Sequence, residues 1–228
     1  MRFIRKANCS ECAVKCDIFF TAREMGLDGE LEPLHVQYRK RETICRRHEE
    51  ITHAIVLLEG HAKMFMEGMN YRNIILNILM PSNYIGLISV FGLSEYNYGV
   101  AALGPCLTCH VDMALVRKMY HGNPNFLMKL NRQFGETVRF IMEKLVSLNQ
   151  KQIRGKIAGS LIYLSELYES DSFTLTLTRK ELGELSAISE ENAVRVLAEF
   201  SKEGIVDVRG REVELRDREA LERISLVG

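Results

Sequence analysis

Residues 178–204 constrain the fold of this chain more than any other stretch, because two capped amphipathic segments lie there with a short turn between them. Thr178 and Glu181 have the spacing of a capping box, which predicts a first helix beginning at Arg179. Ser189 is a favoured N-cap residue and predicts the start of a second helix. Two short helices joined by a tight turn form a helix-turn-helix.

A two-stranded hairpin, the wing of a winged helix, is expected directly after the second helix, because apolar residues flank Arg209-Gly210-Arg211 on both sides. Glu191 and Arg195 lie one turn apart on the polar face of the second helix. In a helix-turn-helix that face enters the major groove, where Arg can bind guanine and Glu can accept from cytosine. The alternative is an ordinary surface ion pair, and these two residues alone favour that alternative.

Residues 175–215 resemble the C-terminal domain of the CRP/FNR family of bacterial transcription factors. The family pattern is a capped helix, a turn, a recognition helix with E-x-x-x-R, a Gly, a strand and a wing, and it is matched in register by Ser189, Glu191, Arg195 and Leu197. The resemblance implies binding to a palindromic site in double-stranded DNA, with a TGA-type half-site core. The DNA-contacting residues that it implies are Thr178, Arg179, Ser189, Glu190, Glu191, Val194, Arg195, Arg209 and Arg211.

The chain from His35 to Asp112 is rich in short β-type runs separated by turn residues, which predicts an antiparallel sandwich or small barrel. Residues 57–65 and 78–92 resemble the strand-turn-strand and phosphate-cassette regions of a cyclic-nucleotide-binding jelly roll. The sensor pocket that this resemblance implies is formed by Gly86, Leu87, Asn97 and Tyr98.

The cassette departs from its family where cyclic AMP is bound. In nucleotide binders a Glu follows the Gly, and an Arg further on binds the phosphate. Here Leu87 follows Gly86, and residues 95–101 contain no Arg. A cyclic phosphate would lack its charge-assisted donor, so we expect no tight binding of cyclic AMP.

Three cysteines, Cys9, Cys12 and Cys16, fall within eight residues, and the C-x-x-C pair has a spacing that suits a metal ion or an iron–sulfur cluster. By resemblance to FNR-like regulators, Cys109 would be the fourth ligand of a [4Fe-4S] cluster. The three residues between the second and third cysteines are fewer than in the best-known members of that branch, and His110 is an alternative ligand. A cluster, another metal such as zinc, and free thiols without a metal all remain open.

An apolar seven-residue repeat runs through the segment from Pro124 to Asn149 and predicts a helix that pairs with a second copy as a parallel coiled coil. The competing interpretation is an amphipathic helix packed on its own domain. The predicted interface residues are Leu127, Phe134, Val138, Ile141, Leu145 and Leu148.

The charge balance weakens the DNA-binding interpretation, because residues 151–228 carry 12 Lys and Arg against 15 Asp and Glu, a net charge of −3. Affinity for DNA depends on phosphate neutralisation, so we expect weak non-specific binding. No Walker loop, G-x-G-x-x-G or catalytic motif indicates an enzyme. No apolar run approaches a membrane span and no signal-peptide core follows the basic start, so we expect a cytoplasmic protein.

The predicted fold is α+β with two domains: a jelly roll, a long dimerisation helix and a winged helix-turn-helix. We place a Cys-containing segment at 1–30, the sensor domain at 31–123, the dimerisation helix and hinge at 124–150 and the DNA-binding domain at 151–228. The predicted function is a homodimeric transcription regulator that senses a redox, gas or small-molecule signal and contacts RNA polymerase if it activates. The alternative is a ligand- or metal-binding sensor whose winged helix serves protein–protein contact.

Overall fold

The computed structural model describes residues 2–6, 8–68 and 73–227. Two compact units divide the chain. The first contains Met1–Met66 and Asn77–Arg139, and the second contains Glu67–Leu76 and Phe140–Gly228. No helix within the described residues is both long enough and apolar enough to cross a membrane.

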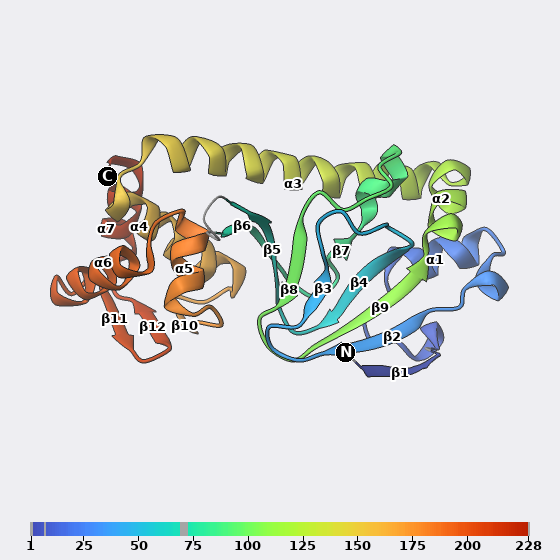
Figure 1. Ribbon diagram of the computed structural model, residues 1–228, viewed down its shortest axis with the longest axis horizontal. Coiled ribbons are helices and arrows are strands. Elements are labelled where there is room, and N and C mark those ends of the chain that lie inside the picture. The colour runs from blue at the N-terminus through green and yellow to red at the C-terminus, as the bar shows by residue number, and fades with distance from the viewer. Residues whose placement is uncertain (1, 7, 69–72, 228) are drawn as a thin grey trace. The chain divides into compact units, whose positions relative to one another are not determined.

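Strands β1 to β9 form two antiparallel sheets, which are labelled in Figure 1. One sheet has the order β1-β2-β9-β4-β7 and the other the order β3-β8-β5-β6. The strands are β1 Arg2–Lys6, β2 Leu34–Tyr38, β3 Thr43–Cys45, β4 His53–Glu59, β5 Ala62–Glu67, β6 Asn73–Leu79, β7 Tyr84–Ile85, β8 Gly99–Ala102 and β9 Cys106–Asp112. The jelly-roll prediction of a β-sheet sensor domain is confirmed, although nothing in the sequence had indicated β1, which pairs with β2.

The core of the first unit is built from β-branched and aliphatic residues of the central strands. Ile55, Val56 and Leu57 of β4, which lies between β9 and β7 in its sheet, are at most 4% exposed. Cys45 and Cys106 are also buried, at 3% exposure each, and Cys106 donates to the His61 carbonyl.

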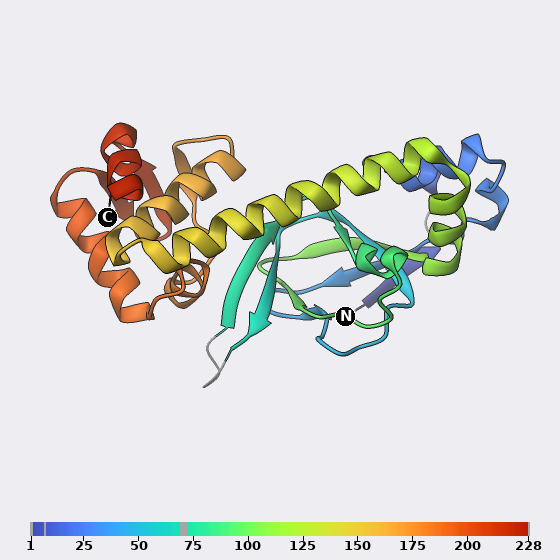
Figure 2. The same ribbon diagram turned by 90° about the horizontal axis from the view of Figure 1, so that it is seen from above.

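The helical segments of the first unit are short until α3. They are the 3-10 turns η1 Cys9–Glu11, η2 Asp28–Glu30 and η4 Leu87–Phe91, and the helices α1 Asp17–Glu24 and α2 Met113–Gly122. The α3 helix, Pro124–Gln150, is uninterrupted over 27 residues and passes from the residues of the first unit into those of the second (Figure 2). Pro124 suits its first position, where the missing N–H has no intrahelical partner.

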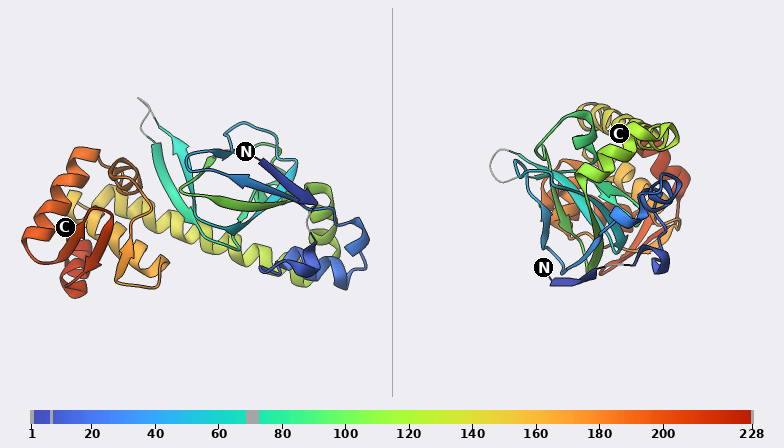
Figure 3. Two further views of the ribbon diagram at one scale, coloured as in Figure 1. Left: turned by 90° about the horizontal axis from the view of Figure 1, so that it is seen from below. Right: turned by 90° about the vertical axis from the view of Figure 1, so that its right-hand side faces the viewer.

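The second unit is a helical core with a small antiparallel sheet. Its elements are α4 Ile153–Leu167, β10 Ser172–Thr174, α5 Arg179–Ser186, α6 Glu190–Lys202, β11 Val206–Arg209, β12 Glu212–Leu215 and α7 Arg218–Val227, with the sheet in the order β10-β12-β11. In Figures 1 and 3 these elements run from orange to red. Leu161, Leu182, Phe200 and Leu221 have no exposed surface and tie four helices to one core.

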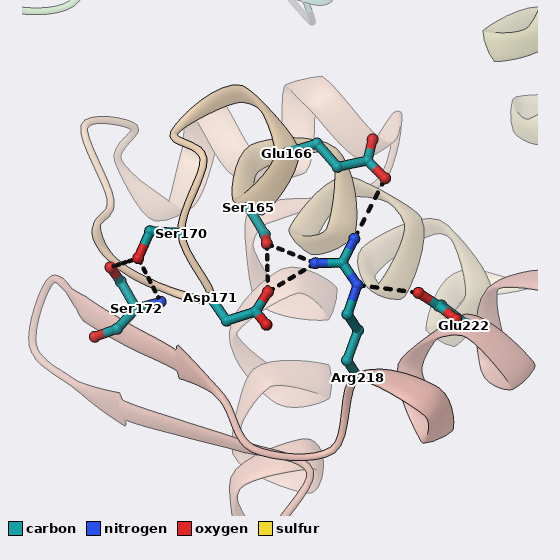
Figure 4. Close-up of polar contacts among 7 residues, drawn as sticks. All are labelled: Ser165, Glu166, Ser170, Asp171, Ser172, Arg218 and Glu222. Carbon is teal, nitrogen blue, oxygen red and sulfur yellow. Dashed lines mark hydrogen bonds and ion pairs between the residues drawn. The ribbon is translucent and has the colours of Figure 1, made fainter.

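Arg218 fastens α7 to the end of α4 (Figure 4). Its Nη1 donates to Ser165 Oγ at 3.1 Å and to Asp171 Oδ1 at 2.7 Å. Its Nη2 lies 3.4 Å from Glu166 Oε1, and its Nε donates to Glu222 Oε1 at 3.0 Å. One guanidinium therefore joins two helices and the loop before β10.

Candidate functional sites

The helix-turn-helix begins with the predicted capping box. Thr178 Oγ1 accepts from the Glu181 backbone N–H at 3.1 Å, and the Glu181 carboxylate accepts from the Thr178 backbone N–H at 2.8 Å. Ser189 Oγ accepts from the Asn192 backbone N–H at 3.3 Å and caps α6. The predicted starts of both helices are thus confirmed, because each depends on a local hydrogen bond between neighbours in sequence.

The turn between α5 and α6 is tightly constrained at two positions. A Cβ at Gly183 would lie 2.9 Å from the Ile188 carbonyl oxygen, so only a glycine fits there without a shift. Ala187 has φ 49° and ψ 46°, a left-handed conformation that is unfavourable for a residue with a side chain. These two residues fix the angle at which α6 leaves the turn.

The α6 helix presents a polar face above a buried apolar one. Ala193, Val196, Leu197 and Phe200 face the core, at most 3% exposed. Among the residues predicted to contact DNA, Glu190, Glu191, Val194 and Arg195 are exposed on the same helix. Val194 is 47% exposed, a large share for an apolar side chain.

Arg195 is held by two residues of its own helix. Its Nη1 donates to Glu199 Oε1 at 2.6 Å, and its Nη2 donates to Asn192 Oδ1 at 3.3 Å. The sequence had directed attention to Glu191 as its neighbour, and the importance of Glu199 was missed. The i,i+4 spacing of Arg195 and Glu199 was the signal that could have revealed it.

The start of α5 and the turn of the wing are tied together. Arg179 Nη2 donates to the Gly210 carbonyl at 2.7 Å, while Arg179 Nη1 is buried and has no hydrogen-bond partner within the described part of the chain. Burial, and then the charge of Arg211, lower the pKa of Arg179. Arg211 is exposed in the same turn, and Arg209 pairs with Asp207 at 2.8 Å. Cationic groups therefore gather where α5 begins.

The cassette region of the first unit is occupied by aromatic side chains. Tyr98 Oη accepts from the Gly86 backbone N–H at 3.2 Å. Gly86 has a φ of 89°, and a Cβ there would lie 3.1 Å from Tyr96 Oη. Both tyrosines are buried, at 5% and 8% exposure, and burial raises the pKa of each phenol. Of the four predicted pocket residues, the structure brings Gly86 and Tyr98 together, whereas Leu87 is half-buried and Asn97 is exposed.

A second contact of the cassette comes from α2, and the sequence gave no sign of it. The Arg117 side chain donates from Nη2 to Ser89 Oγ, and from Nε to the Ser89 carbonyl at 3.4 Å. Ser89 is 1% exposed and lies in η4, directly after the Gly86 turn. The cassette is therefore held at Gly86 and at Ser89 by side chains from outside it.

The four cysteines predicted as ligands come from two distant parts of the sequence and lie within electrostatic reach of one another. Burial raises the pKa of the Cys109 thiol, and nearby Cys16, Cys9 and Cys12 raise it further. Burial, with Cys16 and Cys12, raises the pKa of Cys9 to about 11. No three His, Cys, Asp or Glu side chains in the part of the chain that the structure describes come together in a way that can hold a metal ion.

His110, the alternative ligand, has partners of its own. Its Nε2 lies 3.0 Å from Thr108 Oγ1, and its ring meets that of His53 edge-on at 6.1 Å between centroids. Burial, and then the charge of His53, lower the pKa of His110 to about 4. His110 is therefore neutral at physiological pH.

The predicted dimer face follows one side of α3. Phe134, Val138 and Leu145 are 42%, 38% and 54% exposed, and Leu127, Ile141 and Leu148 are half-buried. Met128 and Met142 of the same helix are 65% and 63% exposed and were not predicted as interface residues. Phe126 and Leu130, by contrast, are 1% exposed and belong to the core of the first unit.

Two family models match the chain: the cyclic nucleotide-binding domain over residues 35–123 and the Crp-like helix-turn-helix domain over residues 155–224. The transcriptional activator protein Anr of Pseudomonas aeruginosa is 22% identical, aligned over 100% of this chain and 96% of the relative. The cAMP-activated global transcriptional regulator CRP of Salmonella typhimurium is also 22% identical, over 82% of this chain and 92% of the relative.

Solved structures show the same fold. FixK2 of Bradyrhizobium japonicum has a TM-score of 0.78 at 19% identity and covers 85% of this chain and 98% of its own. The c-di-GMP responsive global regulator CLP of Xanthomonas campestris has a TM-score of 0.73 at 18% identity, over 86% of this chain and 98% of its own.

Proposed function

The chain belongs to the CRP/FNR family of DNA-binding transcription regulators, and from this premise we propose that it works as a homodimer on a palindromic site, controlled by a signal other than cyclic AMP. The observation that carries the DNA-binding part is the exposed face of α6, where Glu191, Val194 and Arg195 stand above a fully packed core. Residues on such a face have the donors, acceptors and apolar groups that base edges in the major groove require.

Within this proposal, Arg195 binds a guanine through its remaining guanidinium N–H groups, and Val194 meets the methyl group of a thymine. Arg179 lies close to Arg211 at the start of α5 and supports a phosphate contact there, since a guanidinium binds phosphate through charge-assisted hydrogen bonds. Arg211 is close enough to lower the pKa of Arg179, and one bound anion would offset the repulsion between the two cations. Local placement of cations thereby compensates for the net charge of −3 over residues 151–228.

The homodimer is supported by the exposed stripe of α3. Phe134, Val138, Ile141 and Leu145 alternate at spacings of three and four residues, as the a and d positions of a coiled coil do. Exposure of 38% to 54% at three of these positions leaves apolar surface that a second copy would cover. Two helix-turn-helix units held in this way would contact half-sites about one DNA turn apart.

A signal other than cyclic AMP is supported by the cassette. The Gly86 backbone N–H, a group of the kind that binds an anion, already donates to Tyr98. Tyr96 and Tyr98 fill the surrounding interior, and the cassette carries neither the acidic nor the basic residue that holds a cyclic nucleotide in the family. The cassette sequence therefore lacks the two charged side chains that hold that ligand in the family.

A [4Fe-4S] cluster is the cofactor that we propose, with Cys9, Cys12, Cys16 and Cys109 as ligands. The proposal is supported by proximity, because Cys16 and Cys12 raise the pKa of Cys9 and all three N-terminal cysteines raise the pKa of Cys109, and thiolates are the ligands of such clusters. As the structure places the described side chains, they do not form a metal site, so a cluster would require the thiols to move together. The raised pKa values also mean that iron would have to displace the thiol protons. A bound cluster would supply the redox and oxygen sensitivity of the sensor.

A short path leads from these cysteines to the cassette. Burial, and then the charges of Cys16 and Asp17, raise the pKa of Tyr84, so its phenol lies beside the start of α1. Tyr84 belongs to β7 and is followed by Ile85 and Gly86. A displacement of Cys16 would therefore reach the cassette through Tyr84.

The DNA-binding assignment is tested by Arg195→Ala. A palindrome selected from a random duplex library by the unaltered protein is titrated by fluorescence anisotropy, and Arg223→Ala in α7 serves as the charge-matched control. We expect Arg195→Ala to lose about 5-fold to 100-fold in specific affinity, the range for one bidentate base contact, with little change in the control. Undiminished specific binding by Arg195→Ala would show the assignment to be wrong.

The cluster is tested by anaerobic purification, an absorption spectrum, and iron and sulfide analysis. A brown protein with about four irons and four sulfides per chain is the expected result. A colourless, iron-free protein that still binds the selected palindrome would eliminate the cluster.

A further inference from the structure

Glu199 stands between two arginines, one from its own helix and one from α4. Its Oε1 accepts from Arg195 Nη1 at 2.6 Å, and its Oε2 accepts from Arg154 Nη1 at 2.9 Å. Because each carboxylate oxygen is engaged by a different guanidinium, the side chain of Glu199 is restrained on both sides.

Arg154 is itself firmly placed. Its Nη1 and Nη2 donate to the two oxygens of Glu203 at 2.9 Å and 2.6 Å, a bidentate pair. Its guanidinium carbon lies 4.8 Å from the centre of the Phe200 ring. Since Phe200 has no exposed surface, this stacking anchors Arg154 to the core of the second unit.

Arg195 receives its orientation from residues on both sides along α6. Asn192 holds Nη2 from three residues before, and Glu199 holds Nη1 from four residues after. A guanidinium has five N–H donors, so these two contacts leave donors for a base. An arginine that is already oriented also loses less side-chain entropy when it binds.

The position of Arg154 in the chain gives this arrangement its significance. Arg154 is the second residue of α4, and α3 ends at Gln150. The first turn after the long helix is therefore connected, through Glu199, to the residue proposed to recognise a base. The two residues are 41 positions apart in the sequence, so only the packing of α4 against α6 brings them together.

We infer that Glu199, held by Arg154, is a positioning residue that presets the Arg195 guanidinium for base recognition. The inference rests on the proposed function of Arg195. Exposed ion pairs add little to the free energy of folding, so the consequence of the arrangement is expected in sequence discrimination and not in stability.

The test compares Glu199→Gln with Glu203→Gln. Both substitutions keep the side-chain size, lie in or directly after α6 and remove one negative charge, so both should raise the affinity for every DNA sequence to a similar degree. Only Glu199→Gln weakens the contact with Arg195, whereas Glu203→Gln removes a partner of Arg154 alone. Arg154→Met adds a third variant that keeps apolar packing on Phe200 and frees Glu199.

The measured quantity is sequence discrimination, the ratio of affinities for the correct and changed base pair, at the position that Arg195→Ala no longer distinguishes. Anisotropy titrations of the selected palindrome and of versions changed at that pair give the ratio of affinities, and thermal unfolding checks that each variant is folded. We expect the ratio to fall by about 5-fold to 10-fold in Glu199→Gln, part of the value of one bidentate base contact. The ratio should fall by a smaller factor in Arg154→Met, and by less than about twofold in Glu203→Gln.

Two results would overturn the inference. One is an unchanged ratio in Glu199→Gln, and the other is an increased ratio, which would mean that Glu199 competes with DNA for Arg195. Failure of the proposed function is recognised separately, because Arg195→Ala would then distinguish every base pair as the unaltered protein does.

Discussion

Ala187 provides the sharpest test of how the helix-turn-helix is built. It is the residue directly after α5 and has φ 49° and ψ 46°, a left-handed conformation that glycine adopts readily and that is strained for other residues. Ala187→Gly should therefore stabilise the second unit, although glycine is usually destabilising. The sign of the effect depends on whether the relief of strain in the turn exceeds the cost of the more flexible unfolded chain and of the lost methyl group.

The magnitude follows from three contributions. Relief of the left-handed strain contributes about 1–2 kcal/mol. The greater freedom of glycine in the unfolded chain costs about 0.4–1 kcal/mol. Loss of a half-buried methyl group costs a further ~0.4 kcal/mol. The central values leave a net gain of about 0.4 kcal/mol, which changes the opening equilibrium constant by about twofold.

Hydrogen exchange followed by mass spectrometry measures the opening equilibrium locally, as the protection of backbone amides in peptides that cover α5 and α6. The control is Ala198→Gly in the exposed middle of α6, which should reduce protection because glycine costs about 1 kcal/mol in a helix interior. Opposite signs for the two substitutions are expected. Reduced protection in both would refute the assignment of strain to Ala187.

Three further predictions concern other parts of the molecule. The hydrogen bond from Ser165, together with Arg218, lowers the pKa of Asp171 in the folded protein. The stability that this carboxylate contributes is therefore present above its unfolded pKa and is lost as the pH falls through its lower folded pKa. The free energy of unfolding of Asp171→Asn, measured with urea, should depend less on pH below about pH 4 than that of the unaltered protein. Tyr98→Phe removes the acceptor of a buried backbone N–H and should destabilise the first unit by about 1–3 kcal/mol, as measured by urea unfolding; an unchanged midpoint would contradict this role. Cys109→Ser should lower the iron and sulfide content of anaerobically purified protein, whereas Cys45→Ala should not, and equal loss in both would indicate a general folding defect.

The features that could be predicted from the sequence depend on residues close together in the chain. The capping box of Thr178 and Glu181 and the N-cap at Ser189 each rest on a spacing of three residues, and the structure confirms both. The wing was predicted from the apolar residues that flank Arg209 and Arg211, and β11 and β12 confirm it. Local physical chemistry was sufficient in these cases.

The features that escaped prediction depend on contacts between distant residues. Arg117 and Ser89 are 28 positions apart, and Arg154 and Glu199 are 45 apart. Their pairing depends on how strands and helices pack, which no short pattern encodes. Cys109 of β9 was connected to the N-terminal cysteines only through resemblance, and its proximity to them is seen in the effect of Cys16, Cys9 and Cys12 on its pKa.

The acidic balance of the second unit gives the proposed dimer a specific role. A single unit offers few cations at the proposed DNA face, chiefly Arg179 and Arg211, and its net charge over residues 151–228 is −3. One unit alone should therefore bind DNA weakly. When two copies of the chain pair, the binding of the second copy of this domain to DNA becomes intramolecular. The overall affinity then rises without any new contact, provided that the spacing of the two domains matches that of the half-sites. Because each domain alone binds DNA weakly, the affinity of the dimer depends strongly on this match in spacing. A small displacement of α3 that changes the spacing would therefore suffice to switch DNA binding.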